Sequence, residues 1–204
     1  MGRAFDKEFW GDRSRLTALE GVRCKGNWLG ARPRYVRETW GESGVLRVAD
    51  ALGGREREWF MKPPLSFAWF PISALFAMDE VICSDLMGGH LERMVSFGEA
   101  IADNDLNVLY RAFFRLGTPH FFLARSHLIF NQYASAGDVR SKAHPGQCHT
   151  VMNDIALPRY LCRYGIRGYI RAALNAAGAK NAVVRHSRCV HDGAARCEYE
   201  STWE

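Results

Sequence analysis

The spacing of hydrophobic residues divides this sequence into a helical part and a part with alternating positions. Up to Gly137 the apolar residues recur every three or four positions, as on the buried face of a helix. Gly41 and the pair Gly53-Gly54 are expected to end helices. The spacing also indicates a short strand near 22–24. The predicted helices are 27–40, 44–52, 71–87, 90–105, 106–116 and 119–133, with a shorter one near 13–19.

Beyond Gly137 apolar and polar residues alternate, which is the pattern of a strand with one buried face. A helix over 158–177 separates two predicted hairpins. The chain is therefore predicted to be α+β, with a helical N-terminal two thirds packed on a small antiparallel sheet formed mainly by the C-terminal third. Residues 1–20 are interpreted as a lead-in and 21–204 as one domain. The predicted strands are 139–143, 149–155, 180–189 and 197–203.

The last hairpin carries a cysteine on each arm. Asp192-Gly193 is a strong turn signal, because glycine tolerates the positive φ that a tight hairpin demands. A three-residue connection places Cys189 directly opposite Cys197. Every second residue from Cys197 onward falls on one face of its strand. The two thiols, with His186 three residues upstream, are interpreted either as part of a zinc site or as a buried pair.

Composition limits the classes of function. A chain of 204 residues that is 48% hydrophobic can bury a proper core. Its net charge is only +5 and its 22 arginines are scattered, which argues against nucleic-acid binding. The first 23 residues carry charges throughout, so we expect no secretory signal and a reducing, cytoplasmic location for the six cysteines. The longest uncharged run, 65–78, is too short to span a membrane.

No catalytic motif stands out in the sequence. It has no glycine-rich phosphate loop after a strand, no Gly-x-Ser-x-Gly turn and no Cys/His/Asn signature. The tract 144–149 contains two histidines and a cysteine, but its spacing fits no closed zinc pattern and it is interpreted as a Pro-Gly turn. We therefore expect that the protein is not an enzyme.

Several segments carry a resemblance to known families. Cys24-Lys25-Gly26, the run 34–48 and Phe67-Ala68-Trp69-Phe70-Pro71 resemble the opening of a paralogous domain family of unknown function that is abundant in myxobacteria. The segment 165–203 is similar to the C-terminal pattern of that family, and also resembles the 4-vinyl reductase small-molecule-binding domain. Their wider superfamily includes heme nitric-oxide-binding domains and related Golgi-transport subunits. The resemblance implies helices packed on a small antiparallel sheet, with an apolar internal cavity.

The resemblance also implies a metal site. In some sensor domains of the 4-vinyl reductase type, three cysteines and one glutamate hold a zinc near the C-terminus. Cys189 and Cys197 match two of those cysteines, Cys162 is similar in place to the third, and His186 stands at the acidic position. Three thiolates and an imidazole form a common structural zinc set. On a regular strand His186 and Cys189 face opposite sides, so a shared metal requires a bulge or a strand end. Buried thiols and a redox pair across the hairpin are the alternatives.

Heme is not expected from the same comparison. The heme-binding branch is recognised by Tyr-x-Ser-x-Arg, and the nearest match here, Tyr133-Ala134-Ser135-Ala136-Gly137, lacks the arginine. His120 and His127 lie seven residues apart, a spacing typical of two unliganded histidines on one helix face.

The aromatic residues are interpreted first as core and, through the resemblance, as the wall of a pocket. Candidates for that wall are Phe113, Phe114, Phe121 and Phe122. We expect a non-enzymatic module that binds or senses a small hydrophobic molecule and signals through a protein partner, with a homodimer suggested by the relatives. The alternative is a protein–protein interaction or scaffold subunit with a filled core and no ligand.

Overall fold

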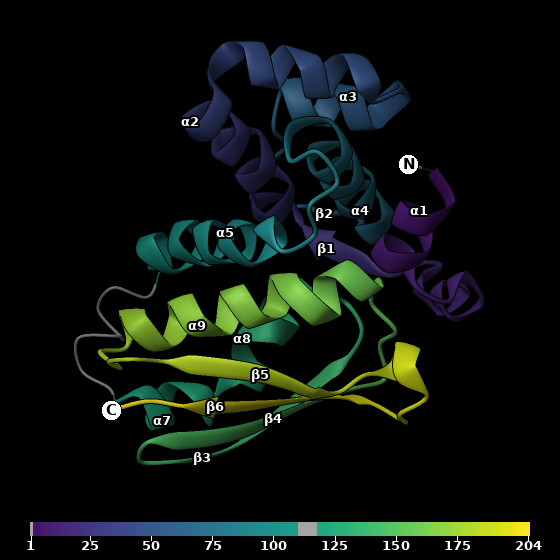
Figure 1. The fold of residues 1–204 in the computed structure, drawn as a ribbon. Coiled ribbons are helices and arrows are strands. Elements are labelled where there is room, and N and C mark those ends of the chain that lie inside the picture. The colour runs from purple at the N-terminus through teal and green to yellow at the C-terminus, as the bar shows by residue number, and fades with distance from the viewer. Residues whose placement is uncertain (1, 110–117) are drawn as a thin grey trace.

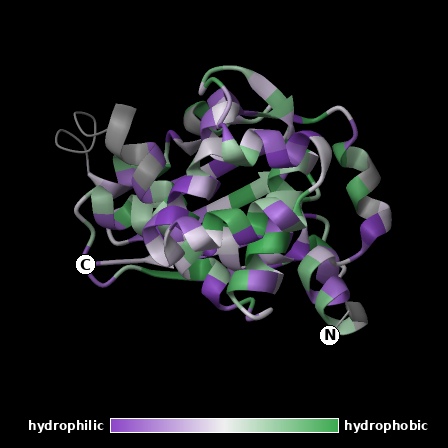
Figure 2. Ribbon diagram, turned by 90° about the horizontal axis from the view of Figure 1, so that it is seen from above, coloured by the Kyte–Doolittle hydropathy of each residue, from purple (hydrophilic) through white to green (hydrophobic). Residues whose placement is uncertain are grey.

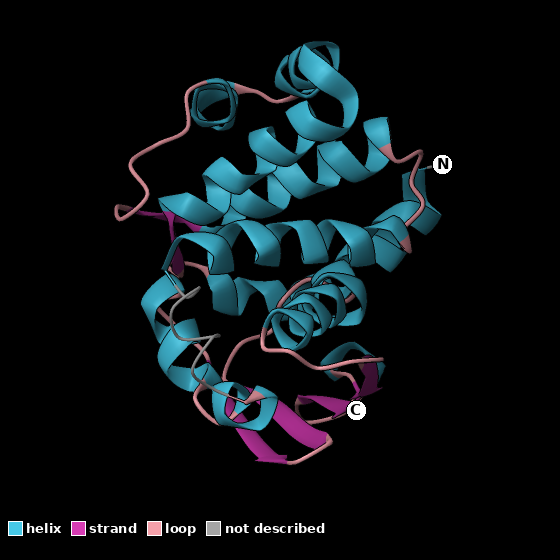
Figure 3. Cartoon of the chain, turned by 90° about the vertical axis from the view of Figure 1, so that its left-hand side faces the viewer, coloured by secondary structure: helices cyan, strands magenta, loops and turns pink. Residues whose placement is uncertain are grey.

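Helices are stacked over a small antiparallel sheet in this computed structural model, which describes residues 2–109 and 118–204. The N-terminal helices form the upper part in Figure 1, and helix α5 lies between them and helix α9. Helix α9 in turn packs on the sheet, and Figure 3 shows the same layering from the side. The α+β architecture predicted from the sequence is confirmed.

The N-terminal part consists of helices and one short ribbon. Strands β1 and β2 pair antiparallel, with Cys24 opposite Phe70. The elements are α1 (Gly2–Trp10), η1 (Arg13–Leu19), β1 (Arg23–Lys25), α2 (Gly26–Ala51), α3 (Gly54–Met61), β2 (Trp69–Pro71), α4 (Ile72–Val81), η2 (Ile82–Leu86) and α5 (Arg93–Leu109).

The C-terminal part holds the main sheet, in which four antiparallel strands follow the order β3-β4-β6-β5. Each of the four predicted strands is present, with ends that differ by a few residues. The elements are α7 (Pro119–Leu123), α8 (Ser126–Tyr133), β3 (Asp138–His144), β4 (Gln147–Asn153), η3 (Leu161–Gly165), α9 (Ile166–Ala176), β5 (Val183–Arg188), η4 (Val190–Asp192) and β6 (Cys197–Thr202).

The structure departs from the sequence prediction mainly near the N-terminus. Residues taken as a lead-in form α1, and its fully buried Phe9 stacks on Tyr160 with ring centroids 4.0 Å apart. Helix α3 was not predicted. The helices predicted on either side of Gly41 are one element, α2, interrupted by the left-handed φ of 70° at that glycine. Helix α5 continues to Leu109, and most of the predicted helix 106–116 lies outside the described residues.

A tyrosine of the C-terminal part is hydrogen-bonded to a buried ion pair between two N-terminal helices. The Arg32 guanidinium on α2 donates two hydrogen bonds to the Asp79 carboxylate on α4, with N–O distances of 2.9 and 3.1 Å. The Tyr160 hydroxyl, just before η3, donates to the same carboxylate at 2.6 Å. Burial, and next the Asp79 charge, raise the pKa of Tyr160 well above its usual value of 10, so its proton stays in the network. Buried charges are tolerated only when they are paired in this way.

Helices α5 and α9 approach each other so closely that glycine is required at the contact. A Cβ atom at Gly168 would overlap the carbonyl oxygen of Val95, and one at Gly98 would overlap the carbonyl oxygen of Gly165. The two backbones therefore touch directly, and this contact fixes the spacing between the layers.

Each helix carries both hydrophobic and hydrophilic residues, as the mixed colours in Figure 2 show. The buried apolar residues form one main core that extends through both parts of the chain. No helix in the described ranges is long and apolar enough to cross a membrane.

The glycine contact predicts a position that is sensitive to a single methyl group. Gly168→Ala is expected to destabilise the protein by about 2 kcal/mol or more, because α5 and α9 must separate to admit it. Gly30→Ala on α2 is the matched control, since its Cβ would only touch the Pro63 Cβ at 3.4 Å and alanine favours a helix by up to about 1 kcal/mol. Urea unfolding followed by far-UV circular dichroism compares the two. An unchanged midpoint for Gly168→Ala would contradict the prediction.

Candidate functional site

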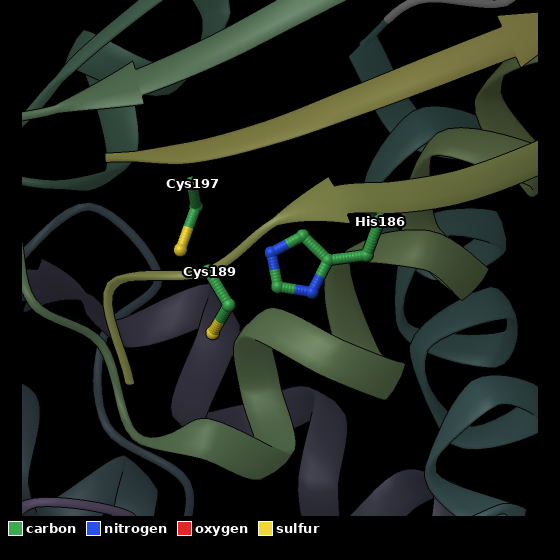
Figure 4. A group of neighbouring side chains, drawn as sticks. All are labelled: His186, Cys189 and Cys197. Carbon is green, nitrogen blue, oxygen red and sulfur yellow. The ribbon is translucent and has the colours of Figure 1, made fainter. Parts of the chain in front are cut away.

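Two arrangements in the structure have the chemistry of a site, and the first is a cluster of one imidazole and two thiols. His186 lies on β5, Cys189 follows that strand, and Cys197 begins β6 (Figure 4). One potential ligand atom from each residue lies within 4.8 Å of the other two. The two cysteines interact, as the sequence predicts, but residues 189–196 with the short helix η4 join the strands in place of the predicted three-residue turn.

A β-bulge brings His186 and Cys189 to the same side of the sheet. His186 is opposite Tyr199, but Arg188 is opposite Glu198, so one extra residue is present on β5 at this point. This extra residue cancels the opposite parity that a regular strand would impose. The bulge that a shared metal requires is therefore present.

The His186 side chain is prepared for ligation. It stacks on Tyr199 with centroids 4.7 Å apart, and it interacts with the main chain of Arg188. Its Nε2 atom is buried and has no hydrogen-bond partner. Burial, and next the Arg163 guanidinium, lower the pKa of His186 to about 4, so the ring is neutral at neutral pH. A neutral imidazole with one free nitrogen is the form that binds a metal.

Cys162 lies next to this cluster but is not part of it. Its Sγ atom is buried and faces the carbonyl oxygen of Leu157 at 3.5 Å. A hydrogen bond with Cys162 is also the main cause that raises the pKa of Cys197 to about 12. The structure thus gathers three of the four predicted zinc ligands and places the fourth beside Cys197.

The donor set of the cluster fits zinc. Zinc binds thiolate sulfur at about 2.3 Å and imidazole nitrogen at about 2.0 Å, so its ligand atoms lie roughly 3–4 Å from one another. His186, Cys189 and Cys197 approach that spacing. Since both thiols carry raised pKa values, binding would have to displace their protons.

The second arrangement is a cavity between the N-terminal helices and the sheet. Its volume is about 170 Å³. Helices α2, α4, α5 and α9 and strands β3 and β4 all contribute to its wall, which is almost entirely apolar. Large side chains that line it include Trp28, Leu75, Phe76, Phe97, Ile101, Phe122, Phe130, Tyr133, Met152, Tyr160 and Tyr169.

Of the four phenylalanines proposed for the pocket wall, Phe122 lines the cavity. Phe121 is 42% exposed and packs against the Arg125 guanidinium instead. Phe113 and Phe114 lie outside the described residues. The other aromatic residues of the wall were treated as general core, because no local pattern distinguishes a cavity wall from a filled interior.

The tyrosine and the serine of the incomplete heme-binding motif lie in different surroundings. Tyr133 lines the cavity, whereas the Ser135 hydroxyl accepts a hydrogen bond from the Arg23 main chain at 2.8 Å. The motif's arginine position is Gly137, with a φ of 97°, and a Cβ atom there would collide with Ile155. The backbone at Gly137 is therefore unsuited to an arginine.

Comparison with known proteins shows which solved structures this fold is similar to. No protein-family model and no curated protein match this sequence. An H-NOX protein from S. oneidensis in its Fe(II)NO state matches with a TM-score of 0.70 and 16% identity, covering 88% of this chain and 99% of that one. The unliganded Fe(II) H-NOX protein from K. algicida matches with a TM-score of 0.65 and 8% identity, covering 88% and 96%.

This chain therefore has an H-NOX-like fold. In fold, the structural matches agree with the heme nitric-oxide-binding branch of the superfamily that the sequence resembles. No family model supports the myxobacterial family or the 4-vinyl reductase domain. At identities this low the likeness extends to the fold alone.

The matched structures bear on heme. One is described as showing heme redox potential modulated through porphyrin distortion, with a TM-score of 0.63, 12% identity and coverage of 87% of this chain and 99% of that one. This match counts against the prediction, made from the incomplete Tyr-x-Ser-x-Arg motif, that heme is not bound. However, the described residues that line the cavity include no histidine or cysteine. The Tyr160 hydroxyl is engaged by Asp79, and His120 contacts Thr118. The residues around the cavity do not fit a histidine-ligated heme.

The lack of a heme ligand in the described part of the cavity wall predicts how the protein responds to hemin. We expect that titration with hemin gives no saturable change in the Soret band at one equivalent, because the described cavity wall offers no imidazole or thiolate. Absorbance spectroscopy of the purified protein measures this. A stoichiometric Soret shift would contradict the prediction. Its loss in His120→Leu or His127→Leu would then identify the axial ligand.

Proposed function

We propose that this domain is a non-enzymatic sensor that binds a small, largely apolar molecule in the cavity between its helices and its sheet. One observation carries this proposal: the cavity is apolar and lies between the two layers in an H-NOX-like fold. Protein interiors are packed with few voids larger than a water molecule. An engineered apolar cavity of about 150 Å³ in another protein binds benzene, and the present cavity of about 170 Å³ is of that size.

The position of the cavity supports a signalling role. Its wall includes Arg32 and Tyr160, which belong to the hydrogen-bond network around Asp79 that joins the two layers. A molecule in the cavity would bias how the layers pack, and a protein partner or a second copy of the chain would receive that change. The homodimer belongs to this proposal. The scaffold alternative, which requires a filled core, is disfavoured by the cavity.

We further propose that zinc stabilises the end of the last hairpin. His186, Cys189 and Cys197 would hold the ion, and Cys162 would complete a closed set after turning from the Leu157 carbonyl. When bound, zinc supplies a structural cross-link between η3 and the hairpin. The buried, unpaired Nε2 atom of His186 supports this assignment.

Native mass spectrometry of protein purified without added metal or chelator tests the zinc site. We expect one zinc for each chain, lost in Cys197→Ser because a hydroxyl is a poor substitute for a thiolate. Cys83→Ser is the matched control, since Cys83 is also buried but lies on η2, outside the cluster. Retention of zinc in Cys162→Ser would exclude that residue as a ligand. A bare chain mass for the wild type, even after zinc is added, would refute the site.

Toluene is a suitable probe of the cavity itself. At ten times its dissociation constant it is expected to raise the melting temperature by about 3 °C, because it binds only the folded state. Ala173→Leu fills the cavity from α9 and should abolish this shift. Ala176→Leu, an exposed position on the same helix, should retain it. No shift in the wild type, measured by scanning calorimetry, would contradict the proposed function.

A further inference from the structure

We propose that the cavity takes a molecule whose apolar body carries an ammonium group, and that Asp105 receives this group. The inference rests on the proposed function, because it assumes that the cavity holds a ligand, and it names the chemical class of that ligand.

Aromatic rings are gathered at one end of the cavity. Trp28 stacks on Tyr133 with ring centroids 5.7 Å apart, and Phe130 lies 6.5 Å from Trp28. All three residues line the cavity. The faces of aromatic rings attract cations, most strongly when the site excludes water, and groups of such rings are used to recognise ammonium compounds.

A buried carboxyl group lies next to Trp28, outside the cavity wall itself. Asp105 is only 5% exposed and is on α5, where it continues the four-residue spacing of Phe97 and Ile101, two residues that line the cavity. The Trp28 indole lines the cavity and also interacts with the Asp105 carboxyl, whose pKa it lowers. A ligand head group that moves this indole aside would reach the carboxyl directly.

The polar atoms around Asp105 are only partly paired. The Asn27 amide donates to Asp105 Oδ1 at 3.2 Å, but Asp105 Oδ2 and Asn27 Oδ1 accept no hydrogen bond, although both are buried. The buried indole N–H of Trp28 interacts with this carboxyl, but it lies outside normal hydrogen-bond geometry. An unpaired buried acceptor is costly, and an ammonium group with three donors can satisfy both oxygens.

The guanidinium groups of Arg32 and Arg34 both act on the Asp105 carboxyl, but their charges do not offset its burial. The Arg32 guanidinium is near enough to act on the carboxyl, but it is paired with Asp79 at 2.9 and 3.1 Å. Burial, opposed next by Arg32, raises the pKa of Asp105 to about 7, which agrees with a charge that is not fully compensated. A positively charged ligand would supply the missing partner.

Calorimetric titration of the full chain with benzylamine, benzyl alcohol and toluene tests this inference. The three probes share one ring and differ in the head group. Benzylamine is expected to bind the wild type about tenfold to a hundredfold more tightly than toluene, because a charge-assisted hydrogen bond is added. Asp105→Asn should remove this preference and leave toluene binding unchanged. Asp103→Asn is the matched control, because Asp103 is on the same helix but exposed.

Each other outcome overturns the proposal at a distinct step. Equal affinities of the wild type for benzylamine and toluene would exclude an ammonium site. An undiminished preference in Asp105→Asn would remove Asp105 from it, and toluene binding by the same variant shows that it is folded. Benzyl alcohol bound as tightly as benzylamine would show that a neutral donor suffices. If toluene fails to bind the wild type, the proposed function fails and this inference with it.

Discussion

The Asp79 carboxylate is the group on which the arrangement of the two layers depends. It is fully buried, and three hydrogen bonds from Arg32 and Tyr160 compensate its charge. Removal of Arg32 would leave the Asp79 charge without compensation in the interior, and removal of the Tyr160 hydroxyl would leave the carboxylate one hydrogen bond short. Since Arg32 belongs to α2 and Tyr160 to the C-terminal part, this requirement fixes how the two parts meet.

The cavity persists because its wall is held by contacts that cannot relax. Arg32 and Tyr160 form one side and are kept in place by Asp79. On the other side the backbone of α5 already touches η3 at Gly98 and α9 at Gly168, so α5 cannot move closer to fill the space. Side chains can move into a void and fill it. A wall that is held by backbone contact and by a paired charge resists such movement.

The sequence predicted what depends on local pattern and missed what depends on packing. Alternation in the C-terminal third gave all four strands of the main sheet, and the turn signal placed Cys189 across from Cys197. The need for a bulge was foreseen, but not its position. The wall of the cavity was predicted only at Phe122 among the described residues, because Trp28 and Tyr160 come from segments far apart in sequence. Neither carries a local signal that separates a cavity wall from ordinary core.

The bulge on β5 also affects how this protein can assemble. Strand β5 is at the edge of the sheet, and an exposed edge with unpaired backbone groups is a template for pairing with another chain. Here the extra residue between His186 and Arg188 interrupts the regular register, and the Arg167 side chain donates to the Val184 carbonyl at 3.4 Å. The irregularity that gathers the imidazole and thiols thus protects this edge from aggregation. Extension of the sheet across β5 into a second copy of the chain is therefore disfavoured at this end of the strand.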